Sequence, residues 1–422
     1  MLTRASSLIL TAALGSGAGL FVQAGGHASN SQDATTSRPA ASADVRISAG
    51  PVARRNTPVS FPMPATGNGV SYVLTGTTGT LPVQISDGMA WTIIPELGAG
   101  ATATFQLSDV TGSQRAASAV AADRHGDDVR ISSGKRPIAQ YVGGAGVLPA
   151  GDIKPIFQRG GYIHPVHTPS GRIVTADYPS DHRHHHGVWF AWTRAVFQGR
   201  DTDFWNMGDA KGRVEFEALE HARTGPVLAD LKVRHRYVDL TSGSPITVLR
   251  EEWGTRFFAS GTQSPYFMFD IDVRQTNVAA APLVLPEYHY GGIALRGAAD
   301  FVPLENAVFL TSEGKDRKTG DAVPSRWAYI AGTVNGARAG LAILAHSKNF
   351  RAPEPMRIHP TDPYLCYVPS KAGPWEIPVK GTHTAQYRFV AFDGSPEPAE
   401  FERLWRDYVE PPTVTVTRSQ AR

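Results

Sequence analysis

The sequence predicts an all-β protein: a large antiparallel β-sandwich preceded by a small β domain, with one C-terminal helix. From about residue 138 to 392 the chain is a succession of short segments, several of which alternate polar and apolar residues, as in sheets with one wet face. Its 42 glycines and 31 prolines suit many turns between short strands. One segment, 398–408, has a clear helical period. Its apolar residues lie on one face, and acidic residues lie near its start, where the helix dipole favours them.

The first residues have the composition of a secretory signal. Arg4 gives a positive start, 8–22 is apolar, and Val22-Gln23-Ala24 ends in a small-residue pattern that signal peptidase reads. We therefore expect a signal peptide over 1–24, a disordered linker over 25–43, and an exported protein, periplasmic or extracellular. No membrane span is expected after cleavage.

Two domains are expected after the linker. A small accessory β domain should occupy 44–125, with strands separated by glycine-rich turns, and the main β-sandwich should occupy 126–412. The expected strands of the small domain are 54–61, 71–74, 82–85, 91–94 and 101–107. The clearest expected strands of the main domain are 138–142, 172–175, 188–192, 213–218, 231–238, 247–253, 266–273, 340–346 and 386–392.

Composition excludes several classes of function. A net charge of +3 without basic runs gives no reason to expect nucleic acid as a partner. The single cysteine, Cys366, excludes an intrachain disulfide and cysteine-based metal sites, and its apolar surroundings predict an inert core thiol. The chain has no phosphate-binding glycine loop, Gly-x-Ser-x-Gly elbow, His-Glu-x-x-His motif or calcium loop.

The main candidate site is the segment 181–186, which holds four histidines, an aspartate and an arginine. If it is extended, His182, His184 and His186 share one face, and Asp181, Arg183 and His185 share the other. His182 and His184 would then be candidate ligands of a divalent metal. A metal-free site is equally consistent, because histidine beside a carboxylate can act as a general base.

Other segments supply further candidates beside this cluster. Aspartate with tryptophan suits sugar binding, since the carboxylate pairs with hydroxyls and the indole stacks on the apolar sugar face. Each segment also has a purely structural interpretation, as a turn, a core tryptophan or a strand-end ion pair. These candidates are His164 and His167; Asp203 and Trp205; Glu287, His289 and Arg296; and His346 and Asn349. The isolated His221, His235, His359 and His383 are expected to be ordinary surface or core residues.

Several motifs resemble a bacterial family circulated as "PmoA-like" or "methane oxygenase PmoA". The resemblance covers about residues 138–392 and rests mainly on 162–171, 177–190, 203–205 and 292–296. Arg183, His186 and Ala345 depart from the residues expected at those positions. The resemblance implies a domain of unknown function, and the label suggests a metal-dependent oxidoreductase. The long sandwich also resembles the galactose-mutarotase-like supersandwich, which implies histidine and carboxylate on a concave sheet.

The leading hypothesis is therefore an exported enzyme acting on a carbohydrate or an oxidised sugar, as a hydrolase, lyase or epimerase. Catalysis is assigned to His182, His185, Glu287 and His346, with Glu287 as the carboxylate partner of an imidazole. Substrate binding is assigned to His164, His167, Asp181, Arg183, Asp203, Trp205, His289, Arg296 and Asn349. A non-catalytic carbohydrate-binding protein and a metal-dependent oxidoreductase are the alternatives.

Overall fold

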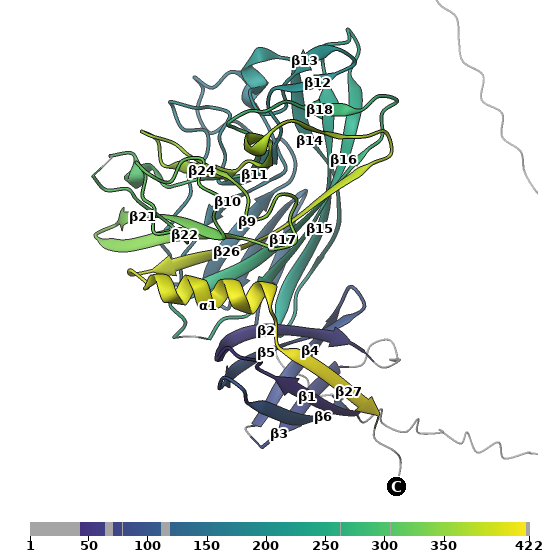
Figure 1. Cartoon of the computed structure of the whole chain (residues 1–422), viewed down its shortest axis with the longest axis vertical. Coiled ribbons are helices and arrows are strands. Elements are labelled where there is room, and N and C mark those ends of the chain that lie inside the picture. The colour runs from purple at the N-terminus through teal and green to yellow at the C-terminus, as the bar shows by residue number, and fades with distance from the viewer. Residues whose placement is uncertain are drawn as a thin grey trace, which may run out of the picture. The chain divides into compact units, whose positions relative to one another are not determined.

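The computed structural model describes residues 43–63, 71–77, 79–110, 119–261, 263–303 and 305–418. The expected signal peptide, 1–24, lies outside the described residues, as does the expected linker except Ala43, the first residue of β1. Within the described ranges the chain is mostly β-strand with a single α-helix, and its strands form four sheets (Figure 1). The expected all-β fold class is confirmed.

The N-terminal strands form a seven-stranded sheet in the order β2-β5-β4-β3-β6-β1-β27. Alternate residues of these strands bury a small core of their own, which includes Val45, Phe61, Leu74 and Phe105. The last strand of the chain pairs antiparallel with β1, so residues beyond 412 complete the N-terminal sheet (Figure 1). The strands are β1 (Ala43–Ser48), β2 (Arg54–Pro62), β3 (Ser71–Gly76), β4 (Gly79–Ser86), β5 (Met89–Leu97), β6 (Thr102–Val110) and β27 (Thr413–Arg418).

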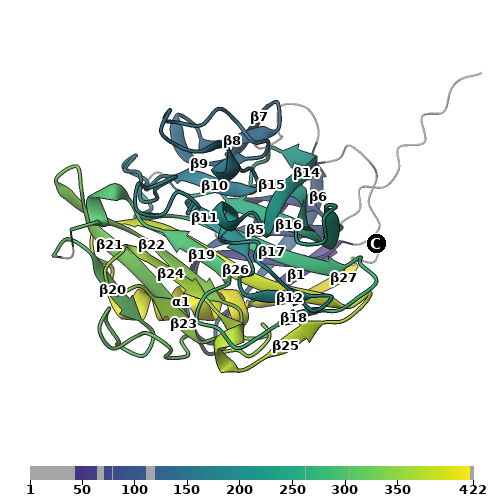
Figure 2. The same cartoon turned by 90° about the horizontal axis from the view of Figure 1, so that it is seen from above.

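Two eight-stranded antiparallel sheets make up most of the remaining chain (Figure 2). The first large sheet has the order β23-β24-β19-β11-β10-β9-β8-β7. Its strands are β7 (Ala121–His125), β8 (Asp128–Ser133), β9 (Arg136–Val142), β10 (Tyr162–Val166), β11 (Val188–Ala191), β19 (Gly292–Arg296), β23 (Met356–Ile358) and β24 (Tyr364–Tyr367).

The second large sheet has the order β14-β15-β16-β17-β26-β22-β21-β20. Its strands are β14 (Gly212–Arg223), β15 (Leu228–Asp239), β16 (Ile246–Phe258), β17 (Tyr266–Asn277), β20 (Val308–Thr311), β21 (Trp327–Val334), β22 (Ala337–Ala345) and β26 (Thr382–Asp393). A four-stranded sheet, β13-β12-β18-β25, contains β12 (Ala195–Phe197), β13 (Arg200–Thr202), β18 (Leu283–Leu285) and β25 (Trp375–Ile377). Short 3₁₀ turns occur at Pro155–Phe157, Met207–Asp209, Ala299–Phe301 and Pro369–Ala372.

The period-two pattern of the sequence decides which face of each strand is buried. In β16, Trp253 and Phe257 are fully buried. Glu252 and Gly254, on either side of Trp253, are only partly buried. Of the expected main-domain strands, 172–175 is wrong: it forms only two isolated bridges, at Ile173 and Thr175. Left-handed residues, Gly171 (φ 86°) and Tyr178 (φ 45°), turn the chain before and after it and leave it too short for a ladder.

Apolar residues of both large sheets share one core, and a buried polar network crosses it. The imidazole of His235 lies 2.7 Å from Glu251 and 2.7 Å from the Tyr141 hydroxyl of the other sheet. Gln275 donates to Glu251 (2.7 Å) and accepts from Trp192 (2.7 Å). Because buried polar groups are costly unless paired, this network favours one alignment of the sheets.

The single histidines His235 and His221 and the only cysteine lie in the ordinary core or surface environments expected for them. His235 lies in the core, and His221 lies 2.8 Å from Asp230. Cys366 is buried in β24, and burial raises the pKa of its thiol to about 12, so the thiol is inert as expected.

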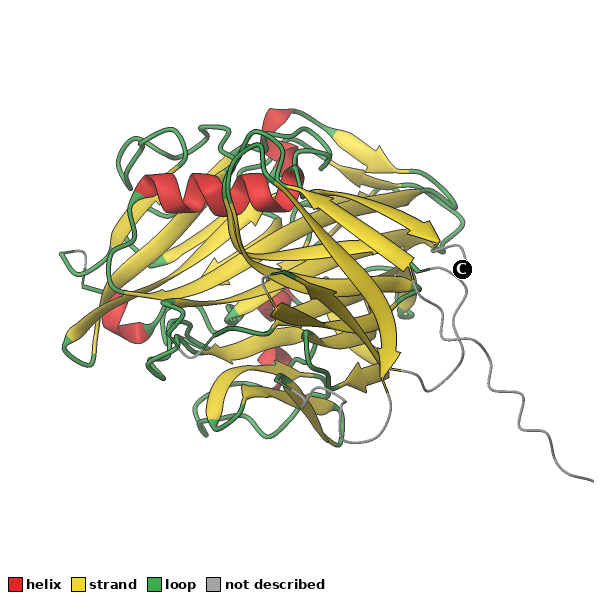
Figure 3. Ribbon diagram, turned by 90° about the horizontal axis from the view of Figure 1, so that it is seen from below, coloured by secondary structure: helices red, strands yellow, loops and turns green. Residues whose placement is uncertain are grey.

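The single α-helix of the described residues, α1 (Pro398–Val409), agrees with the expected helix over 398–408. It lies across strands of the second large sheet (Figure 3). Phe401 and Leu404 pack with Trp327 and Phe392 of the second large sheet. Among helices of the described ranges, none is long and apolar enough to cross a membrane.

A buried ion pair joins α1 to the N-terminal sheet. Asp407 accepts hydrogen bonds from Arg54 of β2 (3.0 Å) and Thr57 of β2 (2.9 Å), and both charged side chains are almost fully buried.

The substitution Asp407→Ala is expected to lower the free energy of unfolding by roughly 3–5 kcal/mol, because Arg54 would remain as a buried cation without its partner. Urea denaturation followed by circular dichroism measures this. Glu410→Ala, at an exposed position just after the helix, should change stability by about 0.5 kcal/mol or less. Equal effects of the two substitutions would contradict a role for the ion pair.

Candidate functional site

The histidine-rich segment is a turn between β10 and β11, so the extended conformation is wrong. The His182 amide donates to the Pro179 carbonyl (3.1 Å), and the His185 amide donates to the His182 carbonyl (2.9 Å). These bonds fold the segment back, so its residues do not alternate between two faces. Gly187 ends the turn where a Cβ would lie 2.3 Å from the Ile163 carbonyl, so only glycine fits there.

The topology of the first large sheet brings three distant segments together at one sheet end. Strand β19 lies between β11 and β24, and Leu295 pairs with Val188 on one side and with Leu365 on the other. Because the strands are antiparallel, β11 begins, β19 ends and β24 begins at the same edge. The histidine turn, Arg296 and the β23–β24 turn therefore meet.

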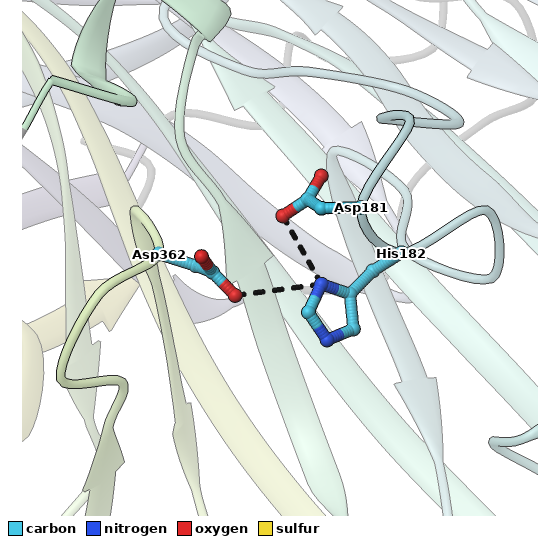
Figure 4. A group of neighbouring side chains, drawn as sticks. All are labelled: Asp181, His182 and Asp362. Carbon is cyan, nitrogen blue, oxygen red and sulfur yellow. Dashed lines mark hydrogen bonds and ion pairs between the residues drawn. The ribbon is translucent and has the colours of Figure 1, made fainter.

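The imidazole of His182 lies between two carboxylates (Figure 4). Its Nδ1 atom is 3.1 Å from Asp181 Oδ2 and 3.4 Å from Asp362 Oδ2. The side chain of His182 is 32 % exposed, so this group is open to solvent. Nε2 points away from both carboxylates and makes no hydrogen bond within the described part of the chain (Figure 4).

Arg296, at the end of β19, holds the histidine turn in place through Asp181. It is 1 % exposed, and its Nη2 atom donates to both oxygens of Asp181, at 3.0 and 2.7 Å. Partial burial would raise the pKa of Asp181, but hydrogen bonds from His182 and Arg296 outweigh this and lower it. Asp181 is therefore an anion at neutral pH.

Below His182 the rings form a stack. His185 is parallel to His182 (4.6 Å, 7°), contacts Tyr364 of β24 (4.6 Å) and is 1 % exposed. Burial, reinforced by neighbouring histidines, lowers the pKa of His185 well below its usual value. The same causes lower the pKa of His184 to about 4. Both rings are neutral at pH 7 and cannot act there as cationic acids.

A second buried pair supports the turn from the interior. His186 Nδ1 lies 2.6 Å from Asp177, whose other oxygen accepts a hydrogen bond from the Tyr162 hydroxyl (2.9 Å). The His186 ring stacks on Tyr162 at 4.3 Å. His164 lies 2.9 Å from the Thr175 hydroxyl, and His167 lies 3.3 Å from the Gly171 carbonyl. These contacts hold the approach to the turn.

The β23–β24 turn contributes residues that sequence reasoning missed. His359, interpreted from the sequence as an isolated histidine, lies 6.0 Å from the His182 ring, and its Nδ1 is 3.2 Å from Asp362. Burial lowers the pKa of His359 despite the nearby Asp362 carboxylate. The only sequence signal is a histidine and an aspartate in a proline-punctuated turn, His359-Pro360-Thr361-Asp362-Pro363.

Glu287, the expected carboxylate partner, is not part of this group. It is exposed and makes no hydrogen bond or ion pair with any residue that the structure describes. His289 is also exposed, between the rings of Tyr288 and Tyr290 (4.3 Å each). The loop nevertheless adjoins the site, because Tyr290 stacks on Tyr364 at 6.0 Å.

Cations border this aromatic loop. The Arg194 guanidinium lies 5.1 Å from the ring centre of Tyr288, and that of Arg357 lies 5.1 Å from Tyr290. Asp321 pairs with Arg357 (3.2 Å) and Lys371 (2.9 Å), which leaves a net positive charge beside the loop.

Asp203 and Trp205 lie in the wall of the site rather than at its surface. Asp203 accepts hydrogen bonds from Thr193, from the amides of Trp205 and Asn206, and from the Asn206 side chain, each 2.8 Å long. Trp205 is 3 % exposed and packs on Trp189 at 5.0 Å. The Asp203 carboxylate is occupied by hydrogen bonds within a turn, and the buried Trp205 ring has no exposed face on which a sugar could stack.

Three other expected site residues point elsewhere. Arg183 binds Asp152 and the Tyr178 carbonyl. The His346 ring packs on Tyr408 of α1 (5.0 Å) and borders a cavity of about 170 Å³, without contact to the histidine turn among described residues. Asn349 donates to the buried carboxyl group of Glu354 (2.8 Å). Strand β22 belongs to the second large sheet, and His346 and Asn349, which directly follow it, do not contact the histidine turn.

Asp181, His182 and Asp362 form a possible metal-binding triad. One ligand atom from each lies within 4.8 Å of the others. Bonds of about 2.0–2.2 Å from one ion join ligand atoms up to about 4.4 Å apart, and His182 Nδ1 lies 3.1 and 3.4 Å from the two carboxylates. His184, the other expected ligand, is not in this triad, and its ring is 5.6 Å from that of His182. Because Arg296 already neutralises Asp181, an added cation would compete with the guanidinium.

A family model described as "Family of unknown function (DUF6807)" matches residues 128–406. The chain belongs to this family. The DUF6807 match covers the histidine turn and every strand of the two large sheets except β7, and it gives no support to the methane oxygenase label. No curated protein matches the chain.

Among solved structures, the chain is similar to a protein of glycosyl hydrolase family 38 from Enterococcus faecalis, with 9 % identity and a TM-score of 0.34. The match covers 89 % of this chain and 47 % of that one, so the chain spans about half its length. Similarity at this level carries no argument about fold or activity.

The carboxyl group beside Asn349 gives a pH prediction. Burial raises the pKa of Glu354 to about 7, although hydrogen bonds from Asn349 and Tyr387 lower it. A raised pKa means that the folded state holds the proton more tightly, so the contribution of Glu354 to stability falls as pH rises from about 4.3 to about 7. Glu354→Gln should remove this decline, which amounts to roughly 3–4 kcal/mol. Urea denaturation between pH 4 and 8 measures the free energy of unfolding of the wild-type protein and of Glu354→Gln. If the two proteins show the same dependence of this free energy on pH, the prediction is contradicted.

Proposed function

We propose that the protein is an exported enzyme that acts on a carbohydrate or an oxidised sugar at the Asp181–His182–Asp362 group. One observation carries this proposal: a partly exposed imidazole has both carboxylates at Nδ1, and its Nε2 faces away from them without a hydrogen bond to any described residue (Figure 4). Such an arrangement fixes the tautomer and leaves a basic nitrogen for a substrate.

His182 acts as the acid–base group in this proposal. With the proton on Nδ1 donated to the carboxylates, the Nε2 lone pair accepts a proton from a sugar hydroxyl, a water or an acidic C–H group. The imidazolium that forms is stabilised by two anions beside it. General acid–base catalysis of this kind contributes about 10²–10⁴-fold in rate. Hydrolysis, elimination and epimerisation each need such a group.

The surrounding residues have supporting roles in the proposal. His185 and Arg296 are positioning residues, since one lies beneath the His182 ring and the other holds Asp181. The aromatic loop 288–290 would offer ring faces to a sugar. Arg194 and Arg357 beside it would attract the carboxylate of an oxidised sugar.

A galactose-mutarotase-like arrangement is compatible with two large antiparallel sheets that share a core. The PmoA-like label supplies no substrate. Export rests on the composition of residues 1–24.

His182→Ala should lower turnover by about 10²–10⁴-fold, because the acid–base nitrogen is lost. Asp362→Asn should cause a smaller fall and shift the pH profile, since one carboxylate beside the imidazole becomes neutral. The assay follows D-glucose, D-galactose, D-glucuronate and D-galacturonate, free and as methyl glycosides, by proton NMR. His125→Ala, at an exposed position on β7, is the matched control. Turnover that is unchanged in His182→Ala would refute the proposal.

A second candidate is metal-assisted chemistry at the same three side chains, which the compact donor set favours. Two carboxylate oxygens and one imidazole nitrogen suit manganese, iron or zinc. When bound, such an ion would act as a Lewis acid or lower the pKa of a water. This would require Nδ1 of His182 to be unprotonated, so the proton and the metal exclude each other.

Elemental analysis of the untagged protein decides between the two candidates. The metal candidate predicts one equivalent of a transition metal per chain, lost in Asp362→Asn and retained in His125→Ala. The metal-free enzyme predicts no stoichiometric metal and full turnover after treatment with EDTA. Stoichiometric metal retained in both Asp362→Asn and His182→Ala would place the ion elsewhere.

A further inference from the structure

A hollow lies on the outer face of the second large sheet, away from the histidine turn. Because Trp253 is in the core, its neighbours Glu252 and Gly254 on β16 project to the opposite face. With Lys232, Asp272, Thr384 and Gln386, they line a cavity of about 490 Å³, which we call the outer-face groove. This volume is within the range of small-ligand sites.

Gly254 creates the floor of the groove. A Cβ added there would meet only Asp272 Cβ, at 4.0 Å, so the space above the strand is open. Glycine inside a strand costs about 0.5–1 kcal/mol, and it often marks a place where a ligand approaches the backbone.

A second cavity, of about 340 Å³, continues the groove and shares Lys348 and Thr384 with it. Its distinguishing residues are two aromatic side chains, which make it the aromatic end of the groove. Phe350 is 40 % exposed, and its ring lies 5.0 Å from that of Trp375. The Arg351 guanidinium lies 4.8 Å from the Phe350 ring centre, but much of the phenyl ring stays exposed. Together with the partly exposed indole, it is a suitable surface for the apolar face of a sugar ring.

The aromatic end also contains a buried polar group without a partner. His383 is 7 % exposed, lies 5.0 Å from Trp375 and lines this cavity. It makes no hydrogen bond to any described residue. Burial lowers its pKa to about 4, so at pH 7 the ring offers one donor and one acceptor. Its ring nitrogens are not fully buried, so the imidazole can exchange hydrogen bonds with a polar ligand in the cavity that it lines.

The charges of the groove favour a neutral ligand. Among the lining residues, Lys232, Arg274 and Lys348 equal Glu252, Asp272 and Glu376 in number, so neither sign of charge dominates the groove. Carboxylates, ammonium groups, hydroxyls and an amide together match hydroxyl groups, which both donate and accept. A peptide strand is disfavoured, because β15, β16, β17 and β26 are interior strands whose backbone groups are already paired.

We propose that the outer-face groove and its aromatic end bind a neutral oligosaccharide, with one sugar ring against Phe350 and Trp375 and further rings above Gly254. The site shares no residue with the Asp181–His182–Asp362 group. Binding here does not depend on the proposed enzymatic function, and it would retain a polymeric carbohydrate at the protein whether or not the histidine turn acts on it.

Isothermal calorimetry tests this with the full chain and four probes: the hexasaccharides of β-1,4-glucose, β-1,4-xylose and α-1,4-glucose, and hexagalacturonate. At least one neutral hexasaccharide should bind. Phe350→Ala should weaken that binding by about tenfold or more through lost stacking. Gly254→Val should do the same by filling the floor, and valine is favoured in strands, so the fold should persist. Val302→Ala, at another exposed apolar position, is the matched control.

Three results would overturn the proposal: no neutral hexasaccharide binds, hexagalacturonate binds more tightly than all of them, or binding is unchanged in both groove variants. Binding that is lost in His182→Ala but kept in Phe350→Ala would place the sugar at the histidine turn instead. That last result would support the enzymatic proposal while removing this one, so the two can fail separately.

Discussion

The histidine turn depends on one buried ion pair, between Arg296 and Asp181. The guanidinium stands at the end of a core strand, 1 % exposed, and a buried cation is tolerated only when an anion and hydrogen bonds satisfy it. That demand fixes Asp181, and Asp181 in turn fixes the position of the next residue, His182. The arrangement of the site thus follows from the electrostatic requirement of a group that cannot reach solvent.

Sheet topology provides what the ion pair needs. Strands β11, β19 and β24 are neighbours, so the beginnings of two strands and the end of the third coincide in space. Asp362 and Tyr364 then lie next to a turn formed almost two hundred residues earlier. The polar network around Glu251 fixes the alignment of the two sheets behind this edge. Loops at the edge of such a rigid frame can hold side chains at defined distances.

Two features of the surface have different physical character. The Asp181–His182–Asp362 group is compact and charged, and its imidazole is partly exposed, as acid–base chemistry or metal binding requires. The outer-face groove is long, neutral overall and aromatic at one end, as a polymer of sugar rings requires. A chain that carries both would hold a polymer on one face and present a reactive group elsewhere on its surface.

Much of the fold follows from local pattern. Alternating residues gave the longest strands of the main domain, β14 to β17, β22 and β26, but not most of its short ones. A single amphipathic segment gave α1, because strand and helix periods are set by backbone geometry. The prominence of 181–186 was also visible, since so many titratable groups in six positions are rare.

The partners of those groups were not visible in the sequence. Glu287 looked like the natural carboxylate, yet Asp362 occupies that place. His346 looked like part of the site but lies on the second large sheet against α1. By itself, the sequence determined the all-β class, the helix, the buried thiol and the segment where a site could form. Only the tertiary structure decided which acid meets which imidazole, because that depends on strand order within a sheet, a property of contacts between residues far apart in the chain.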